Sequence, residues 1–359
     1  MWPETIRGFG PCAGNDLVTV LRVKLTLWRR TRMPFAAAAV LTLALAQPAT
    51  GSAAAAPGDS GGDVTSAARS ISLELDRDFA DPSFLKVGRT WYAFASGDGF
   101  PYATAPDMRG PWRYRGKSMP SRPRWTKQAT RGSYDWAPDV FRRASDGRFL
   151  MYYTAHTKGG RPCIGVATSR SPAGPFVDGH GGPRVCPSGG GALDPAPFTK
   201  LDGTQWMIYA AVGGTIRASR MNADQVRPAG TRPIDLIRRP GTIIEAPVIQ
   251  RSGPRLVMFV SRFHYNDRCR YKTEAFVSVG LTAGTWRSAG DVLSQRNSGL
   301  CGPGGADVAR SGRTTWIMFH AWRCKRSGCD VSRPGPTRRR VMLVGTIGWG
   351  KDSLTPRIQ

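Results

Sequence analysis

The sequence is poor in several features that mark common protein classes. Its 359 residues include 25 Asp and Glu against 51 Lys and Arg, and only four histidines. No two cysteines form a C-x-x-C pair, so a structural zinc site is not expected. The sequence also lacks a basic amphipathic helix and the spacing of a zinc finger, so we expect no nucleic-acid partner.

Long helices are disfavoured as well. The chain contains 43 Gly and 28 Pro, which interrupt helices and favour tight turns between short strands. Its 11 Trp, 14 Phe and 9 Tyr, within a hydrophobic content of 40%, are sufficient for a large core. This composition is typical of an all-β protein.

The formal net charge of +26 has two interpretations. In the first, the arginines are simply spread over a solvated surface. In the second, the charge serves to bind a polyanionic partner such as an acidic polysaccharide. Tight basic runs are short, such as Arg29-Arg30 and Arg338-Arg339-Arg340. The charge therefore bears on partners and solubility rather than on the fold.

The N-terminal region is typical of an export signal. A basic segment precedes an apolar run at residues 35–46, and small residues continue to Ala56. The run is shorter than the roughly 20 residues that a membrane span needs. We predict a signal peptide at 1–56, a flexible lead-in at 57–70 and a folded domain at 71–359 in a secreted protein. Translation from Met33, and twin-arginine rather than ordinary export, remain open.

Seven cysteines are present, and one of them, Cys12, lies in the export segment. The even number that remains indicates disulfides in an exported protein, although several pairings are open. Closure between nearest neighbours predicts Cys163–Cys186, Cys269–Cys301 and Cys324–Cys329.

From residue 71 onward one pattern recurs: an apolar strand start, a turn with glycine, and an aromatic-rich second strand. The starts, spaced by 56, 58, 50 and 60 residues, are Phe84, Val140, Phe198, Val248 and Val308. Each unit is a β-hairpin, and segments 163–169 and 275–279 supply a third strand. Five such units predict a five-bladed β-propeller. A β-sandwich, the alternative, does not explain the even spacing.

Carboxylates recur at the starts of these hairpins. The first strand of each propeller blade lines the central channel, so Asp81, Asp194 and Glu245 should converge at one end of the axis. One such carboxylate would be an ordinary turn residue. Three like charges close together cost free energy, which indicates a functional site. Glycoside hydrolysis requires two facing carboxylates, one protonated and one ionised.

Four motifs, in this order and at blade spacing, resemble glycoside hydrolase family 43 over about residues 75–350. They are Asp81-Pro82-Ser83, Trp136-Ala137-Pro138-Asp139, Asp194-Pro195 and Glu245-Ala246-Pro247. The resemblance implies a five-bladed β-propeller and an inverting glycosidase. Members of the family include α-L-arabinofuranosidases, arabinanases, β-xylosidases and galactan-cleaving exo-enzymes.

The resemblance also implies roles for four residues. Asp81 would be the general base that deprotonates water, and Glu245 the general acid that protonates the glycosidic oxygen. Asp194 would raise the pKa of Glu245 and orient it. Trp136 would form an apolar wall for a sugar face, unless it only packs in the blade core. Asp139 is expected to bond backbone rather than substrate.

One position departs from the family pattern. Many members carry a histidine in the fifth-blade motif, near a metal or water site, where this chain has only Gly, Pro, Ala and Asp at 302–307. We therefore expect no metal ion and no cofactor. His320, on the following strand, is interpreted as a core histidine rather than a ligand.

The resulting prediction is a secreted, monomeric, exo-acting α-L-arabinofuranosidase, or a β-xylosidase, that acts on arabinose- or xylose-containing polysaccharides or oligosaccharides of plant cell walls. Its basic surface would allow docking on acidic pectin. One alternative is a non-catalytic propeller that binds polysaccharide or another polyanion. Another is an invertase- or levansucrase-like enzyme, but those carry Asn and Cys where this chain has Ala80 and Ala246.

Overall fold

The computed structural model describes residues 70–127, 135–324, 339–350 and 355–359. The chain divides into two units, Met1–Asp59 and Ser60–Gln359, and every described residue belongs to the second. The predicted signal peptide therefore lies outside the described residues, as does the lead-in up to residue 69. In the described part of the chain, no helix is both long and apolar enough to span a membrane.

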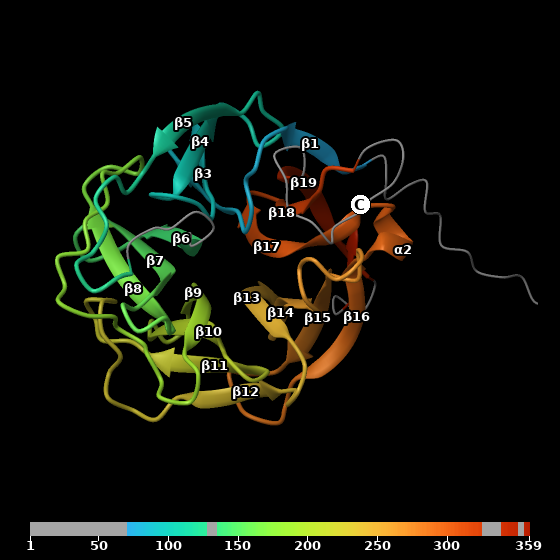
Figure 1. The fold of residues 1–359 in the computed structure, drawn as a ribbon. Coiled ribbons are helices and arrows are strands. Elements are labelled where there is room, and N and C mark those ends of the chain that lie inside the picture. The colour runs from blue at the N-terminus through green and yellow to red at the C-terminus, as the bar shows by residue number, and fades with distance from the viewer. Residues whose placement is uncertain (1–69, 128–134, 325–338, 351–354) are drawn as a thin grey trace, which may run out of the picture. The chain divides into compact units, whose positions relative to one another are not determined.

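Five antiparallel sheets surround one axis and form a five-bladed β-propeller, as predicted (Figure 1). Blade 1 contains β2 (Ser83–Val87), β3 (Thr90–Phe94), β4 (Pro101–Ala105) and β5 (Arg113–Lys117). Blade 2 contains β6 (Trp136–Arg142), β7 (Phe149–His156) and β8 (Pro162–Ser169). Blade 3 contains β9 (Ala192–Thr199), β10 (Gln205–Ala211), β11 (Thr215–Arg220) and β12 (Ile234–Arg238). Blade 4 contains β13 (Ile244–Ser252), β14 (Arg255–Arg262), β15 (Lys272–Ser278) and β16 (Arg287–Leu293).

Blade 5 is built from both ends of the described chain. It contains β17 (Cys301–Ser311), β18 (Thr314–Trp322), β19 (Arg340–Trp349), β20 (Pro356–Ile358) and β1 (Ser72–Leu75). The N-terminal strand β1 pairs antiparallel with β19, so the first described strand closes the last blade. The short helix α2 (Gln295–Ser298) lies between blades 4 and 5 in the sequence.

The core of the propeller lies between neighbouring blades. Five clusters of buried side chains fill the five spaces between the sheets. Strand β14 shows the principle, because alternate residues of a strand face opposite sides of the sheet. Leu256, Met258 and Val260 pack into the core shared with blade 3, whereas Val257 and Phe259 pack into the core shared with blade 5.

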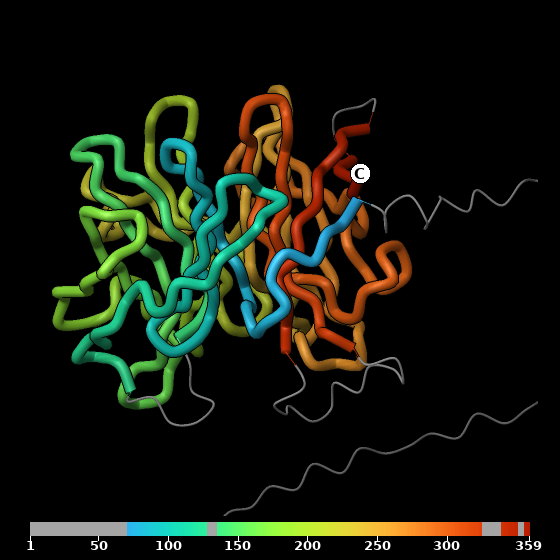
Figure 2. Tube along the Cα trace, turned by 90° about the horizontal axis from the view of Figure 1, so that it is seen from above, coloured from blue at the N-terminus to red at the C-terminus, as the bar shows by residue number. Residues whose placement is uncertain are grey.

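The hairpin pattern and two disulfides are confirmed. Each predicted hairpin is present, with an innermost strand followed by an aromatic-rich second strand, and the strands run between the two faces of the ring (Figure 2). The predicted third strands correspond to β8 and β15. The disulfides Cys163–Cys186 and Cys269–Cys301 are formed. The predicted Cys324–Cys329 pair includes Cys329, which lies outside the described residues.

Candidate active site

In every blade a residue near the start of the innermost strand has the left-handed backbone conformation; in blade 1 this residue lies two positions before β2. The values of φ are 48° for Asp81, 45° for Ala137, 54° for Asp194, 48° for Ala246 and 56° for Gly305. A positive φ is unfavourable for a residue with a Cβ atom, and such outliers concentrate at functional sites. The five positions therefore define the mouth of the channel. Glu245 stands one residue before the blade 4 position rather than on it.

Backbone hydrogen bonds tie these five residues to the preceding blade. In each case the N–H group donates to a side chain of the neighbouring blade. The pairs are Asp81 N–H with His320 Nδ1 (3.0 Å), Ala137 with Ser96 Oγ (2.8 Å), Asp194 with Thr154 Oγ1 (2.9 Å), Ala246 with Asp194 Oδ2 (2.9 Å), and Gly305 with Ser261 Oγ (2.8 Å). The mouth is thus a closed ring of five inter-blade bonds.

The hydrogen bond from Ala246 of blade 4 to blade 3 differs from the other four in its acceptor. Thr154 supplies the acceptor from the second strand of blade 2, and the strand register places Ala210 at the corresponding point of blade 3. An alanine side chain cannot accept a hydrogen bond, and the Asp194 carboxylate takes that position in the ring. Asp194 is thereby held beside Ala246, the residue that follows Glu245.

Asp81 is surrounded by groups that favour its ionised form. Ser96 Oγ donates to Asp81 Oδ2 at 2.6 Å, and Arg340 Nη1 lies 3.4 Å from Oδ1. Burial raises the pKa of Asp81, but Arg340, His320 and Ser96 together lower it below its usual range. His320 is buried and its pKa falls to about 3, so its ring is neutral near pH 7. Arg340 and Ser96 therefore keep Asp81 ionised.

Glu245 and Asp194 have the opposite electrostatics. Burial raises the pKa of Glu245 to about 7, with a further rise from the charge of Asp81, against a lowering by the hydrogen bond from Tyr271. Burial and the charges of Glu245 and Asp81 raise the pKa of Asp194. Two carboxyls that interact this strongly titrate as a pair. The pair thus retains a proton at a pH where Asp81 has none.

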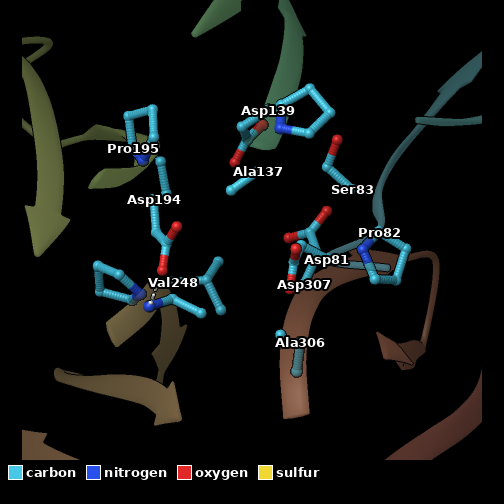
Figure 3. Close-up of a pocket in the computed structure, with 15 residues that line it drawn as sticks. Asp81, Pro82, Ser83, Ala137, Asp139, Asp194, Pro195, Val248, Ala306 and Asp307 are labelled. Atoms are coloured by element: carbon cyan, nitrogen blue, oxygen red, sulfur yellow. Dashed lines mark hydrogen bonds between the residues drawn. The ribbon is translucent and has the colours of Figure 1, made fainter. Parts of the chain in front are cut away.

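A second group of polar residues lies deeper in the channel, two residues along the same strands. Ser83, Asp139 and Asp307 line the axial cavity with Asp81 and Asp194 (Figure 3). Asp307 accepts the Phe84 N–H at 2.9 Å, whereas Asp139 has no hydrogen bond to any described residue. The expected backbone bond of Asp139 is therefore not seen. Burial, together with the charge of Asp307, raises the pKa of Asp139.

Trp136 occupies the position in blade 2 that Glu245 occupies in blade 4. Its half-buried ring packs edge-on against His156, with the ring centroids 4.4 Å apart. The location at the channel mouth is compatible with contact to a sugar. Its predicted role in substrate binding stays a prediction.

The fifth blade lacks a side chain at the mouth because two rings occupy the space. A Cβ atom on Gly304 would lie 2.2 Å from the Tyr271 ring, and one on Gly305 would lie 2.6 Å from His320 and 2.7 Å from Asp81 Oδ1. A histidine cannot stand at either position without displacing these groups. Within the described residues, no group of three or more His, Cys, Asp or Glu side chains is arranged to hold a metal ion. The absence of a metal stays a prediction.

Several residues of the site were not singled out from the sequence. Arg340 ends the basic run Arg338-Arg339-Arg340, whose charge was expected to bear on partners and solubility, yet it pairs with the partly buried Asp81. Tyr271 directly precedes β15, and its hydroxyl donates to Glu245 Oε1 at 2.8 Å. The only sequence signal for either residue is its place at the start of an apolar strand. That signal does not identify a partner in another strand.

The comparisons with known proteins agree with this geometry. The model of the family "Glycosyl hydrolases family 43" matches residues 75–353. An extracellular exo-α-(1→5)-L-arabinofuranosidase of Cellvibrio japonicus is 29% identical over 51% of this chain, and the match spans only 58% of that enzyme. An extracellular endo-α-(1→5)-L-arabinanase of Bacillus subtilis is 25% identical over 75% of this chain and 84% of that enzyme.

Solved structures share the fold. The α-L-arabinanase of Cellvibrio cellulosa superimposes with a TM-score of 0.65 at 23% identity, over 79% of this chain and 95% of that one. An exo-1,5-α-L-arabinanase from a bovine ruminal metagenomic library has a TM-score of 0.63 at 23% identity, over 80% of this chain and 100% of that one.

Proposed function

Because the chain belongs to glycosyl hydrolases family 43, we propose that its propeller is an inverting glycosidase that cleaves arabinose-containing polysaccharides. The observation that carries the proposal is the opposite displacement of the pKa values at the channel mouth. The pKa of Asp81 is lowered, and that of Glu245 is raised to about 7. Hydrolysis with inversion requires an ionised base and a protonated acid at the same pH.

In the proposed mechanism each carboxyl has one task. Asp81, ionised beside Arg340 and Ser96, removes a proton from the attacking water. Glu245 donates its proton to the glycosidic oxygen as the bond to the anomeric carbon breaks. Asp194 is held against the Ala246 N–H, and in the ionisation state of the pair in which Asp194 carries the charge it favours the protonated form of Glu245.

The proposed substrate is α-(1→5)-linked arabinan or its oligosaccharides. Support comes from the relatives, whose names describe an exo-acting arabinofuranosidase and an endo-acting arabinanase for this linkage. We propose exo action, with release of single arabinose units. Endo action is the second candidate, because the endo-arabinanase aligns with the larger share of this chain.

Incubation of the purified protein with linear arabinan tests both candidates. Chromatography of early products distinguishes arabinose alone, expected for exo action, from a series of oligosaccharides, expected for endo action. NMR of the first product gives the configuration of the new anomeric centre, and inversion is expected. Lack of product from a panel of arabinose-, xylose- and galactose-containing polymers would favour the non-catalytic alternative.

Two further parts of the proposal concern the setting of the enzyme. We propose secretion, since both relatives are named as extracellular enzymes and the two disulfides require an oxidising compartment. We also propose that the net charge of +26 retains the enzyme on acidic pectin. Retention on immobilised polygalacturonate that does not fall with added salt would contradict this second part.

A further inference from the structure

The hydroxyl of Tyr271 lies between Ser261 and Glu245 and donates its hydrogen to Glu245. Gly305 N–H donates to Ser261 Oγ at 2.8 Å, so the Ser261 hydroxyl accepts there. Ser261 hydrogen-bonds the Tyr271 hydroxyl, which in turn donates to Glu245 Oε1 at 2.8 Å. Since the bond from Ser261 lowers the pKa of Tyr271, Ser261 is the donor to the phenol oxygen, and the phenol hydrogen is left for Glu245. Tyr271 is 2% exposed, so water does not compete for this bond.

The bond from Tyr271 makes the two oxygens of Glu245 unequal. Oε1 accepts the phenol hydrogen, so a proton carried by Glu245 at the same time is placed on Oε2. Burial and the neighbouring carboxylates raise the pKa of Tyr271 well above its usual value. The phenol therefore remains a donor throughout the pH range in which carboxyls titrate.

The ring of Tyr271 also connects the proposed acid to the proposed base. It stacks on His320 with the centroids 5.7 Å apart and the planes 9° from parallel. His320 Nδ1 accepts the N–H of Asp81 at 3.0 Å. One stacked pair thus contacts both Glu245 and Asp81, and it fits because Gly304 has no side chain.

A disulfide anchors the segment that carries Tyr271. Cys269, two residues earlier, is joined to Cys301 at the start of β17. The bridge links blade 4 to blade 5, and both sulfurs belong to a small buried cluster. Tyr271 is therefore held from both sides, by β15 and by the bridge.

We propose that Tyr271 is a positioning residue that confines the transferable proton to Oε2 of Glu245 and, through its stack on His320, sets the distance between Glu245 and Asp81. This inference rests on the proposed function, since it assigns Glu245 as the acid. It extends that function to a residue outside the three carboxylates.

The kinetic test is Tyr271→Phe, which keeps the ring and its stack but removes the hydroxyl. Protonation of the leaving group matters for arabino-oligosaccharides and little for aryl arabinofuranosides with an acidic phenol. We expect kcat/KM to fall on the order of tenfold or more on oligosaccharides and much less on 4-nitrophenyl α-L-arabinofuranoside. Because the lost hydrogen bond favoured ionised Glu245, the alkaline limb should move to higher pH. Equal losses on both substrates with an unchanged pH profile would overturn the proposal.

A second measurement does not depend on turnover. The sequence contains only four glutamates, Glu4, Glu74, Glu245 and Glu274, so carboxyl-13C-glutamate labelling gives few NMR signals. Glu245→Gln identifies the signal of Glu245, and its titration midpoint should rise in Tyr271→Phe. An unchanged midpoint would overturn the proposal. If the wild-type protein is inactive but the Glu245 midpoint still rises in Tyr271→Phe, the proposed function is refuted, whereas the hydrogen bond from Tyr271 to Glu245 is supported.

A matched control is Tyr209→Phe. Tyr209 is a buried tyrosine of β10 whose hydroxyl lies 3.4 Å from Ser219 Oγ, in blade 3. Tyr209→Phe removes a phenol hydroxyl from a ring that is as buried as that of Tyr271. We expect no change in the leaving-group dependence or in the Glu245 midpoint. Comparable effects in both variants would reduce the role of Tyr271 to general stability.

Discussion

Two groups of carboxyls lie in the same channel and differ in their surroundings. The mouth group consists of Asp81, Asp194 and Glu245, and the inner group consists of Asp139 and Asp307. Corresponding positions of the two groups are two residues apart along a strand, which is about 6–7 Å. All five carboxyls are partly buried by the same blades.

Each carboxyl of the mouth group accepts a hydrogen bond, whereas in the inner group Asp307 accepts backbone N–H groups and Asp139 has no hydrogen bond to a described residue. Arg340 and Ser96 bind Asp81, Tyr271 binds Glu245, and the Ala246 N–H binds Asp194. The pKa of one mouth carboxyl is therefore lowered while those of the other two are raised.

In the inner group the pKa values of both Asp139 and Asp307 are raised, that of Asp307 to about 6. Burial by itself favours the neutral form of every carboxyl. Only at the mouth does a carboxyl with a lowered pKa lie beside carboxyls with raised pKa values.

The largest expected effect follows removal of one mouth carboxyl. Asp81→Asn and Glu245→Gln should each lower kcat/KM on arabinan by about 10²–10⁴-fold, the usual contribution of a general base or acid. The matched change in the inner group, Asp139→Asn, should leave kcat/KM nearly unchanged. Initial rates of reducing-sugar release measure all three. Loss of activity in Asp139→Asn as large as in Asp81→Asn would erase the distinction between the groups.

A smaller effect is expected for Asp194→Asn, which keeps an oxygen for the Ala246 N–H and removes the charge. We expect kcat/KM to fall by roughly 10–100-fold, since Glu245 keeps its position and its burial but loses a carboxylate neighbour that favours its protonated form. The alkaline limb of the pH profile should move to lower pH, because a negative neighbour no longer favours the protonated acid. A shift to higher pH would show that Asp194 does not act through its charge.

The pH dependence of kcat/KM for the wild-type protein follows from the pKa values of the mouth group. The acid must be protonated, so kcat/KM should decline as pH rises through about 7, the pKa of Glu245. The base must be ionised, and the lowered pKa of Asp81 places the acidic limb below the usual range of an aspartate. A profile of kcat/KM on arabino-oligosaccharides, whose leaving group needs the proton, measures both limbs. An alkaline limb only above pH 9 would not fit Glu245 as the acid.

The smallest effect concerns stability and the inner group. The pKa values of Asp139 and Asp307 are higher in the folded than in the unfolded state, so their protonated forms stabilise the fold below about pH 4. That stability is lost as pH rises through about 6. Asp139→Asn removes the repulsion and should raise the free energy of unfolding at pH 7.5 on the order of 1–3 kcal/mol.

Calorimetry at pH 4.5 and pH 7.5 checks this prediction. The melting temperature should rise by a few degrees at pH 7.5 and change less at pH 4.5. Ala196 occupies the equivalent inner position of blade 3 and lines the same cavity, so Ala196→Ser is a control that changes one polar atom without changing charge. A lower melting temperature of Asp139→Asn at pH 7.5 would contradict this prediction and would mean that the ionised inner carboxylates bind a positively charged group.

The sequence by itself determined the repeating part of this protein. Five hairpins at even spacing predict the five blades, since strand alternation and glycine turns are local properties. The same repeats place Asp81, Asp194 and Glu245 at one end of the channel. Two disulfides also followed from nearest-neighbour closure.

Only the tertiary structure decided which groups surround those carboxyls. His320 and Arg340 lie 239 and 259 residues from Asp81 in the sequence, and they meet it because β1 closes the ring against β19. Tyr271 reaches Glu245 across blade 4 and excludes a side chain at Gly304. A hydrogen bond or a pKa depends on distances of a few ångströms, and a repeat pattern fixes order along the chain but not those distances.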